Sequence, residues 1–428
     1  MSTTSYLHQP FTGQLGDIIA ELCEKDSYTT LFISVAFAKV SGVLRLKKSL
    51  ELFAKKGATI NAYIGIDLGG TSYEALIALN EICTNLYVAH VGSAQTFHPK
   101  IYAFKSNDSL LAIVGSNNLT GGGLWTNMES SSITALNSST EEDIKAINQI
   151  NEYFTMLSDG TEAVAKKVES REFIDGLLAA CLIEREMTIR IKKARDLKAK
   201  KDSQTGLSSI SNFCFMNSIS APIPNIEALH KKSHREQKKP EVIEAFLGTQ
   251  PDDTENVTLI DKHKGYQTFW FETRKLTGGS RNILDLSMRA KVEKGDPSGT
   301  EYDLGEDNFM GGGVLFFGIN PDSDSSIDVA INYEGTDYLG NTVKFPKGDK
   351  ANGTWRLQIK GVSSAEEKIT DAFEQGYLVD KILVFERIQQ DYFTMTVFSS
   401  SELEEFREAS EIVARNGASQ HAKLFGLL

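Results

Sequence analysis

Residues 97–129 read FHPKIYAFKSNDSLLAIVGSNNLTGGGLWTNME. His98 and Lys100 are two residues apart in a predicted strand, so both side chains lie on one face of that strand. Ser116 and Asn118 are also two apart, at the end of an apolar strand that opens into a glycine-rich loop. If the two strands pair, these four polar side chains converge on one rim of a sheet.

These residue types suit the cleavage of a phosphodiester. An imidazole can attack phosphorus and form a phosphohistidine. A lysine binds a non-bridging phosphate oxygen, while serine and asparagine donate hydrogen bonds to the charge that develops on it. Glu129 begins the next predicted strand, and it either fixes the tautomer of a histidine or only faces solvent. We expect no metal ion and no cofactor, because lysine, serine and asparagine neutralise the charge.

The regions around this stretch alternate between strand-like and helix-like segments. Strands are predicted at 29–37, 59–66, 85–91, 98–104, 109–114 and 128–136, and helices at 41–56, 72–83 and 140–157. Such alternation is typical of a sheet covered by helices on its faces. The glycine run 121–123 either cradles a phosphate or forms a tight loop.

The middle of the chain predicts a domain boundary. A continuous helical pattern covers 161–201, and Asp202–Pro240 then loses periodicity and contains prolines. Thirteen Lys or Arg and six Asp or Glu lie between Glu184 and Lys239, whereas the whole chain has a net charge of -12. This basic segment either contacts phosphate or forms a solvated helix face.

The last part of the chain has a different pattern, with short strand-like runs separated by glycine-rich turns. The runs are 266–273, 313–318, 326–333, 354–359, 381–387 and 392–398. Short strands at such spacing favour a small barrel or a sandwich.

Composition narrows the class of protein. A hydrophobic fraction of 41% excludes wholesale disorder, and no apolar run approaches the roughly 20 residues that a membrane helix needs. The four cysteines form no CxxC pair, which argues against a zinc site or a disulfide framework. The first residues show no secretory signal, so we expect a cytoplasmic protein without a membrane partner.

The runs HPKIYAF and VGSNNLTGGGL together resemble the H-x-K…G-S-x-N motif of the phospholipase D superfamily. That family usually has an Asp five residues after the Lys, where this chain has Lys105. The departure is shared with the branch of metal-independent restriction endonucleases of the BfiI and NgoAVII type, in which a downstream Glu completes the site. The resemblance implies that His98 is the nucleophile and that Glu129 orients a histidine. It implies that phosphate is bound by Lys100, Ser116 and Asn118.

The C-terminal part is similar to the DNA-recognition domain of the same enzymes, at Phe269–Asn282, Gly311–Gly313 and Trp355–Leu357. The similarity implies a pseudobarrel like the plant B-three transcription-factor domain. The candidate DNA-binding residues beside its glycine-rich turns are Arg274, Lys275, Arg281 and Asn282. Arg and Asn can pair with base edges, although turn residues of this kind can also be plain surface.

We therefore expect a multi-domain protein. Its parts are a phospholipase-D-like α/β sandwich over 1–160, a helical and basic linker over 161–240, and a mostly-β DNA-recognition pseudobarrel over 241–428. The predicted function is a sequence-specific, restriction-type endonuclease that cuts double-stranded DNA. The alternatives are a phosphatidyl hydrolase or transferase, and a DNA-binding module whose phosphodiesterase site is vestigial.

The chemistry also predicts a homodimer through the nuclease domain. One histidine attacks phosphorus and a second protonates the departing oxygen, but the chain holds a single copy of the motif. A two-fold axis would bring the partner's copy to the same site. The chain has no Walker-type phosphate loop, so an ATPase or helicase, which some relatives require, would be a separate subunit.

Overall fold

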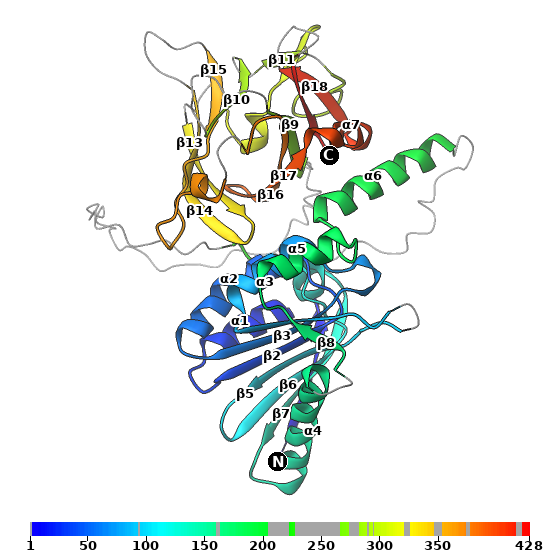
Figure 1. The fold of residues 1–428 in the computed structure, drawn as a ribbon, viewed down its shortest axis with the longest axis vertical. Helices are drawn as coiled ribbons and strands as arrows, with labels where there is room; N and C mark the ends of the chain where they lie inside the picture. The colour runs from blue at the N-terminus through cyan, green and yellow to red at the C-terminus, as the bar shows by residue number, and fades with distance from the viewer. Residues whose placement is uncertain are drawn as a thin grey trace, which may run out of the picture.

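The structure, a computed structural model, describes residues 2–92, 95–159, 163–203, 222–226, 266–273, 282–288, 291–293, 295–320, 326–345, 353–373, 377–416 and 422–428. They form an α/β unit and a mostly-β unit, drawn in the lower and upper halves of Figure 1. Arg274, Lys275 and Arg281 lie outside the described residues.

An eight-stranded mixed sheet forms the α/β unit. Its strands, in spatial order, are β1 (Thr3–Gln9), β7 (Glu129–Asn137), β6 (Ser109–Gly115), β5 (Lys100–Lys105), β2 (Thr30–Val35), β3 (Thr59–Gly65), β4 (Asn85–Ala89) and β8 (Ala165–Lys167). Strands β2, β3 and β4 run parallel, and β5, β6, β7 and β1 pair in antiparallel fashion. The predicted pairing of the two motif strands is confirmed, with Ile101 opposite Val114.

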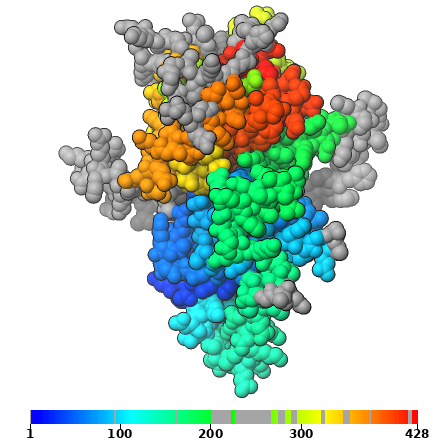
Figure 2. Space-filling model, in the orientation of Figure 1, coloured from blue at the N-terminus to red at the C-terminus, as the bar shows by residue number. Residues whose placement is uncertain are grey.

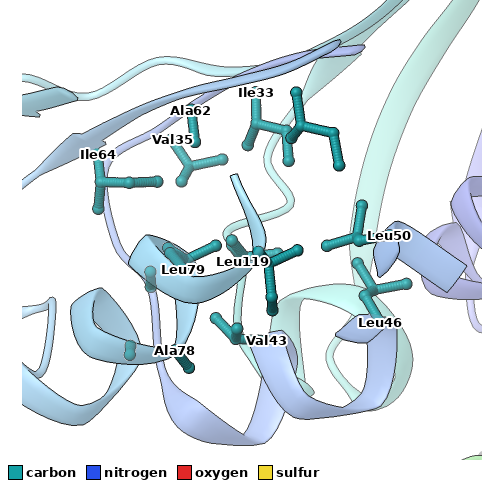
Figure 3. Close-up of a cluster of buried hydrophobic side chains, with 14 of the residues drawn as sticks. Ile33, Val35, Val43, Leu46, Leu50, Ala62, Ile64, Ala78, Leu79 and Leu119 are labelled. Carbon is teal, nitrogen blue, oxygen red and sulfur yellow. The ribbon is translucent and has the colours of Figure 1, made fainter. Parts of the chain in front are cut away.

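Helices cover both faces of this sheet. The first face carries α1 (Leu15–Glu24), α2 (Val40–Lys55) and α3 (Tyr73–Ile82), and the second carries α4 (Glu141–Ser158). Figure 3 shows the core on the first face, where strand residues such as Ile33 and Ile64 lie opposite helix residues such as Val43 and Leu79. The predicted alternation of strands and helices is therefore confirmed.

The continuous helix predicted over 161–201 is wrong. The segment instead contains strand β8 at the sheet edge, helix α5 (Arg171–Ala179) and helix α6 (Glu186–Ser203). Cys181, with a φ of 55°, lies in the break between the two helices. Since β8 pairs with β4 and Ile174 of α5 is buried in the core, the α/β unit continues past residue 160.

The mostly-β unit is a single sheet whose ends nearly meet. Its order is β10 (Ile283–Met288), β15 (Thr354–Gln358), β14 (Thr336–Lys344), β13 (Ser326–Tyr333), β17 (Tyr392–Ser399), β16 (Lys381–Gln389), β9 (Thr268–Glu272), β19 (Lys423–Leu427), β18 (Ile412–Asn416), β11 (Lys291–Glu293) and β12 (Phe309–Gly311). Strand β10 also pairs with β11, which makes the sheet barrel-like. Helix α7 (Leu403–Ala409) lies between β17 and β18.

One predicted strand of this unit, 313–318, is wrong. It forms a short 3₁₀ turn over Leu315–Phe317. Phe316 and Phe317 are buried there, in aromatic contact with Phe269. A short apolar run has no periodicity that separates a buried turn from a buried strand.

Helix α6 packs against the mostly-β unit. Met187 of α6 is buried in one cluster with Trp270 of β9. The Arg190 guanidinium lies 2.6 Å from the Glu386 carboxylate of β16. Figure 2 shows the helical segment, in green, lying against both the blue and the orange-red parts of the molecule.

Helix α2 makes a second contact between the units. The Lys47 ammonium donates to the Gly335 carbonyl and lies 3.3 Å from the Asp337 carboxylate. The Tyr392 hydroxyl donates to the same carboxylate at 2.5 Å. The Lys47 side chain is only 11% exposed, so this ion pair is largely removed from water. Removing Asp337 would leave the largely buried Lys47 charge with only the Glu51 carboxylate, 3.8 Å away.

Glu74, in the first turn of α3, lies in the interface between the α/β unit and the mostly-β unit. Its Oε2 accepts from the Glu186 backbone N–H at 3.0 Å, while its Oε1 has no hydrogen-bond partner among the described residues and is 3.7 Å from Arg185. Burial, with the charge of Glu186 adding to it and Arg185 opposing it, raises the pKa of Glu74 to about 7. The folded protein thus holds this proton more tightly than the unfolded chain does.

A pH-dependent stability follows from Glu74. The bound proton stabilises the folded state fully below about pH 4.5, and this contribution is lost as the pH rises from there through 7, because over that range the folded state keeps the proton while the unfolded chain releases it. Glu74→Gln should therefore match the wild type near pH 5 and exceed it at pH 8, by on the order of 2 kcal/mol in the free energy of unfolding. Denaturant unfolding at both pH values measures this. Glu21→Gln, at an exposed position of α1, controls for a change of charge alone. A Glu74→Gln variant less stable than wild type at both pH values would mean that the carboxylate is ionised and paired with Arg185.

None of the helices in the described ranges combines the length and the hydrophobicity that spanning a bilayer requires.

Candidate functional site

His98 and Lys100 are in direct contact at the start of β5. Lys100 is the first residue of the strand, and His98 lies in the segment just before it. The Lys100 Nζ is 2.7 Å from His98 Nδ1 and 2.9 Å from His98 Nε2. An ammonium can only donate, so a hydrogen bond between the two groups requires a ring nitrogen that carries no proton, and such a nitrogen is the one that can act as a nucleophile. His98 itself is exposed.

Lys100 is held in a partly desolvated position. The residue is only 8% exposed, and burial lowers the pKa of its ammonium, with the negative charge of Glu129 acting in the opposite direction. Its Nζ also donates to the His98 carbonyl at 3.2 Å. A partly desolvated cation attracts an anionic ligand more strongly than a fully exposed lysine does.

Ser116 and Glu129 form the next part of the site, where β6 ends and β7 begins. The Ser116 hydroxyl donates to the Glu129 carboxylate and accepts from the Ser130 backbone N–H at 3.1 Å. Glu129 also accepts from the Asn127 side-chain amide at 3.2 Å. The motif resemblance implies that Glu129 orients a histidine, but the hydrogen-bond partners of Glu129 among the described residues are Ser116 and Asn127.

Asn118 is positioned by its neighbours. Its Oδ1 accepts from the Phe37 backbone N–H at 3.2 Å, and the Phe37 ring contacts the His98 ring edge-on with centroids 5.8 Å apart. The next residue, Leu119, is fully buried and projects into the core among residues of α2 and α3 (Figure 3). Phe37 thus contacts both Asn118 and His98.

The loop after β6 is packed rather than open. Asn117, 1% exposed, donates to the Gly123 carbonyl at 2.7 Å and accepts from the Ser131 hydroxyl. A side chain at Gly123 would come within 2.4 Å of the Asn118 carbonyl. Residues Gly122–Thr126 form a π-helical turn. The glycine run therefore permits close packing behind Asn118, which favours the tight-loop interpretation over a phosphate cradle.

A carboxylate that is not among the predicted site residues lies beside the His98 segment. Asp67, just after β3, accepts from the Phe97 backbone N–H at 2.9 Å and from His90 Nδ1 at 2.7 Å. Asp67 is 5% exposed, and Phe97 immediately precedes His98. One sequence feature could have indicated Asp67: it follows the buried strand β3, and His90 follows the neighbouring parallel strand β4 by one residue. The ends of parallel neighbours meet at the same edge of a sheet.

The basic segment of the chain is largely paired where the structure describes it. Besides Arg190, α6 directs Arg195 to Glu408 at 2.9 Å, and Lys198 donates to the carbonyls of Glu408 and Ser410. These cations bind the protein's own C-terminal unit. Of the expected DNA-binding residues, Asn282 is half-buried just before β10, and its carbonyl accepts from the Ile359 N–H.

Within the described ranges, no cluster of three or more His, Cys, Asp or Glu side chains could hold a metal ion. The two described histidines other than His98 have partners elsewhere: His8 contacts the Ser130 hydroxyl at 3.0 Å, and His90 contacts Asp67.

No protein-family model and no curated protein matches the chain. Among solved structures, it is similar to the phospholipase D family member Nuc from Salmonella typhimurium, with 15% identity and a TM-score of 0.29 over 40% of this chain and 100% of that one. It is similar to NucT from Helicobacter pylori, with 13% identity and a TM-score of 0.26 over 36% and 96%. It is also similar to phosphatidylserine synthase from Haemophilus influenzae, with 12% identity and a TM-score of 0.30 over 48% of each chain. At TM-scores of this size the likenesses assign no activity.

Proposed function

We propose that the chain is a metal-independent, restriction-type DNA endonuclease. The observation that carries the proposal is the contact between the His98 imidazole and the Lys100 ammonium at the start of β5, next to strand β6, after which Ser116 and Asn118 follow. The set provides a nucleophile, a cation and hydrogen-bond donors, which phosphodiester cleavage requires. The motif's resemblance to phospholipase D nucleases points to the same chemistry.

The reaction follows from the contacts. The Lys100 ammonium changes its hydrogen-bond acceptor from the His98 ring to a non-bridging phosphate oxygen, because a charge-assisted bond to phosphate is stronger than one to imidazole. The freed His98 nitrogen attacks phosphorus, so an N–P bond forms and the P–O bond to the departing strand end breaks. The departing oxygen takes a proton from a second imidazole. Water then attacks phosphorus, the N–P bond breaks, and the water's proton passes to that imidazole.

The second imidazole belongs, in this proposal, to His98 of a partner subunit. Support comes from exposed apolar side chains beside the site: Val114 is 47% exposed two residues before Ser116, Met128 is 55% exposed next to Glu129, and Tyr6 is 69% exposed on β1. Ser132 of β7 is the register partner of both Tyr6 on β1 and Val114 on β6, so the Tyr6 and Val114 side chains lie on the same face of the sheet. An apolar surface of this kind beside the site suits a second copy of the chain.

The proposed substrate is double-stranded DNA, and the barrel-like unit is the proposed source of sequence preference. Two observations support this role of the barrel-like unit. Phe269–Asn282 is similar to the recognition domain of related endonucleases, and the unit has a hydrophobic core of its own. The contacts made by Lys47 and Arg190 join that unit to the α/β unit, so a bound duplex would be held in a defined relation to His98.

Plasmid cleavage in the presence of EDTA tests the mechanism. Cleavage should persist without divalent metal, because Lys100 and the polar donors already supply the charge stabilisation. Supercoiled plasmid is converted to nicked and linear forms on gels, with His98→Ala as the blank. Activity that EDTA abolishes and magnesium restores would overturn the mechanism.

Two further readouts of the same reaction separate the alternatives. Mapping the product ends should show cuts clustered around one sequence, whereas randomly placed ends would leave a nuclease without the proposed recognition. Phosphatidylcholine vesicles incubated with the same protein should release no headgroup. Headgroup release without plasmid cleavage would favour the phosphatidyl hydrolase alternative.

A further inference from the structure

We propose that Asp67 and His90 form a positioning pair that holds the backbone segment of the nucleophile His98. The inference deepens the proposed function and rests on it for its catalytic consequence. Neither residue belongs to the H-x-K…G-S-x-N motif, and neither has a side-chain contact with His98 among the hydrogen bonds of the described residues. Their effect on the reaction would therefore be indirect.

Both oxygens of the Asp67 carboxylate are used. Oδ2 accepts from the Phe97 backbone N–H at 2.9 Å, and Oδ1 accepts from His90 Nδ1 at 2.7 Å. A carboxylate can only accept, so the His90 proton resides on Nδ1 and the ring orients the carboxylate towards Phe97. The arrangement matches histidine–carboxylate pairs in which one group fixes the orientation of the other.

The segment is also held on the other side of His98. The Pro99 carbonyl accepts from the Ala36 N–H at 3.0 Å. The Phe97 ring is 7% exposed and packs against Gly65, where a side-chain carbon would lie 3.0 Å from the ring and 2.8 Å from the Ala36 carbonyl. His98 thus lies between two hydrogen-bonded backbone groups, and on the Phe97 side the backbone N–H donates to the Asp67 carboxylate.

Loss of that bond would leave the Phe97 N–H without its acceptor, and the segment would relax to find another. A displacement of about 1 Å at a reacting group can cost about 10²-fold in rate. His90 is partly exposed, with 46% of its side chain in contact with solvent, and it lines an open pocket of about 630 Å³ together with Thr96. It can therefore be replaced with little disturbance of the core.

Three variants and a matched control test the pair. Asp67→Ala removes both acceptors, and His90→Ala removes the orienting ring. Asp67→Asn keeps an oxygen for Phe97 and can donate to His90 once that ring moves its proton to Nε2. The control is Asp143→Ala, because Asp143 is also a buried carboxylate, 3% exposed, that accepts from a backbone N–H, that of Asn137, at the start of α4. Each variant is measured by kcat and KM on plasmid, by unfolding temperature, and by hydrogen exchange of the peptide covering residues 95–100.

We expect Asp67→Ala to lower kcat about 10²-fold with KM changed less than about threefold, since position rather than binding is lost. His90→Ala and Asp67→Asn should lower kcat by about three- to tenfold. Exchange in 95–100 should accelerate in Asp67→Ala and His90→Ala. Asp143→Ala should lower the unfolding temperature but leave kcat within about twofold and exchange in 95–100 unchanged.

The outcomes separate this inference from the proposed function. A folded Asp67→Ala with wild-type kcat and wild-type exchange overturns the positioning pair, as does an equal loss of kcat in Asp143→Ala. If Asp67→Ala does not fold, His90→Ala decides, and unchanged kcat with unchanged exchange then overturns the pair. A wild-type protein that cuts no DNA refutes the proposed function, while the exchange comparison still shows whether the pair holds the segment.

Discussion

Replacement of His98 by alanine should reduce plasmid cleavage by at least about 10³-fold while the unfolding temperature stays near that of the wild type. The imidazole is the atom group that would bond to phosphorus, and water has no way to replace it in forming that intermediate. The side chain is exposed, and its polar contacts are with Lys100, so its removal should disturb little of the core. Cleavage is followed by single-turnover kinetics with enzyme in excess.

The matched control is His8→Ala. His8 is another exposed histidine of the same unit, whose ring contacts the Ser130 hydroxyl instead of Lys100. It should retain cleavage within a few-fold of the wild type. If His98→Ala kept more than a few per cent of the wild-type rate, the nucleophile would have to be a different residue.

When wild-type chains are mixed with His98→Ala chains, the plasmid-cleavage rate per wild-type chain should fall, because the heterodimers are inactive. With a tenfold excess of His98→Ala chains, each wild-type chain pairs mostly with an inactive one, and the rate per wild-type chain should fall about tenfold if the site needs both subunits. The reason is chemical: one imidazole attacks, and the other must supply a proton to the departing oxygen. The chains are mixed, left to exchange subunits, and assayed on plasmid.

A tenfold excess of His8→Ala chains serves as the control, because those chains carry an intact His98 and should add activity. Sedimentation of the wild type should give the mass of a dimer. A monomer with full activity, or a rate that simply follows the amount of wild-type chain, would refute the shared site.

Much of the α/β unit could be predicted because its strands and helices carry strong local patterns. The run TLFISV of β2 is apolar and β-branched, and α2 presents a clear stripe through Val43, Leu46 and Leu50. Strand β1 and helix α1 were not predicted. The residues of β1 are mostly exposed polar ones, and the strand is defined by its pairing with β7 rather than by its own composition. Helix α6 lies within the predicted helical stretch, and its Met187 and Ile191 pack in one cluster with Trp270 of the other unit.

The candidate site was predictable to the extent that its residues lie on one short motif. His98, Lys100, Ser116 and Asn118 fall on adjacent strand ends, where residue spacing determines which side chains meet. Asp67 was not predictable in this way, because its contact with Phe97 spans 30 residues and depends on the parallel order of β2, β3 and β4. The hydrogen bond from Ser116 to Glu129 likewise depends on how β6 and β7 turn at their ends.

The contact between Lys47 and Asp337 has an evolutionary consequence. The two residues lie on different units, and both side chains are largely shielded from water. A mutation of either one alone leaves a buried charge, whereas replacing both by apolar groups of similar size can be close to neutral. The two positions are therefore expected to drift together among descendants of this chain, and a barrel-like unit transplanted from another lineage would fit only if it carried an acid at the matching position.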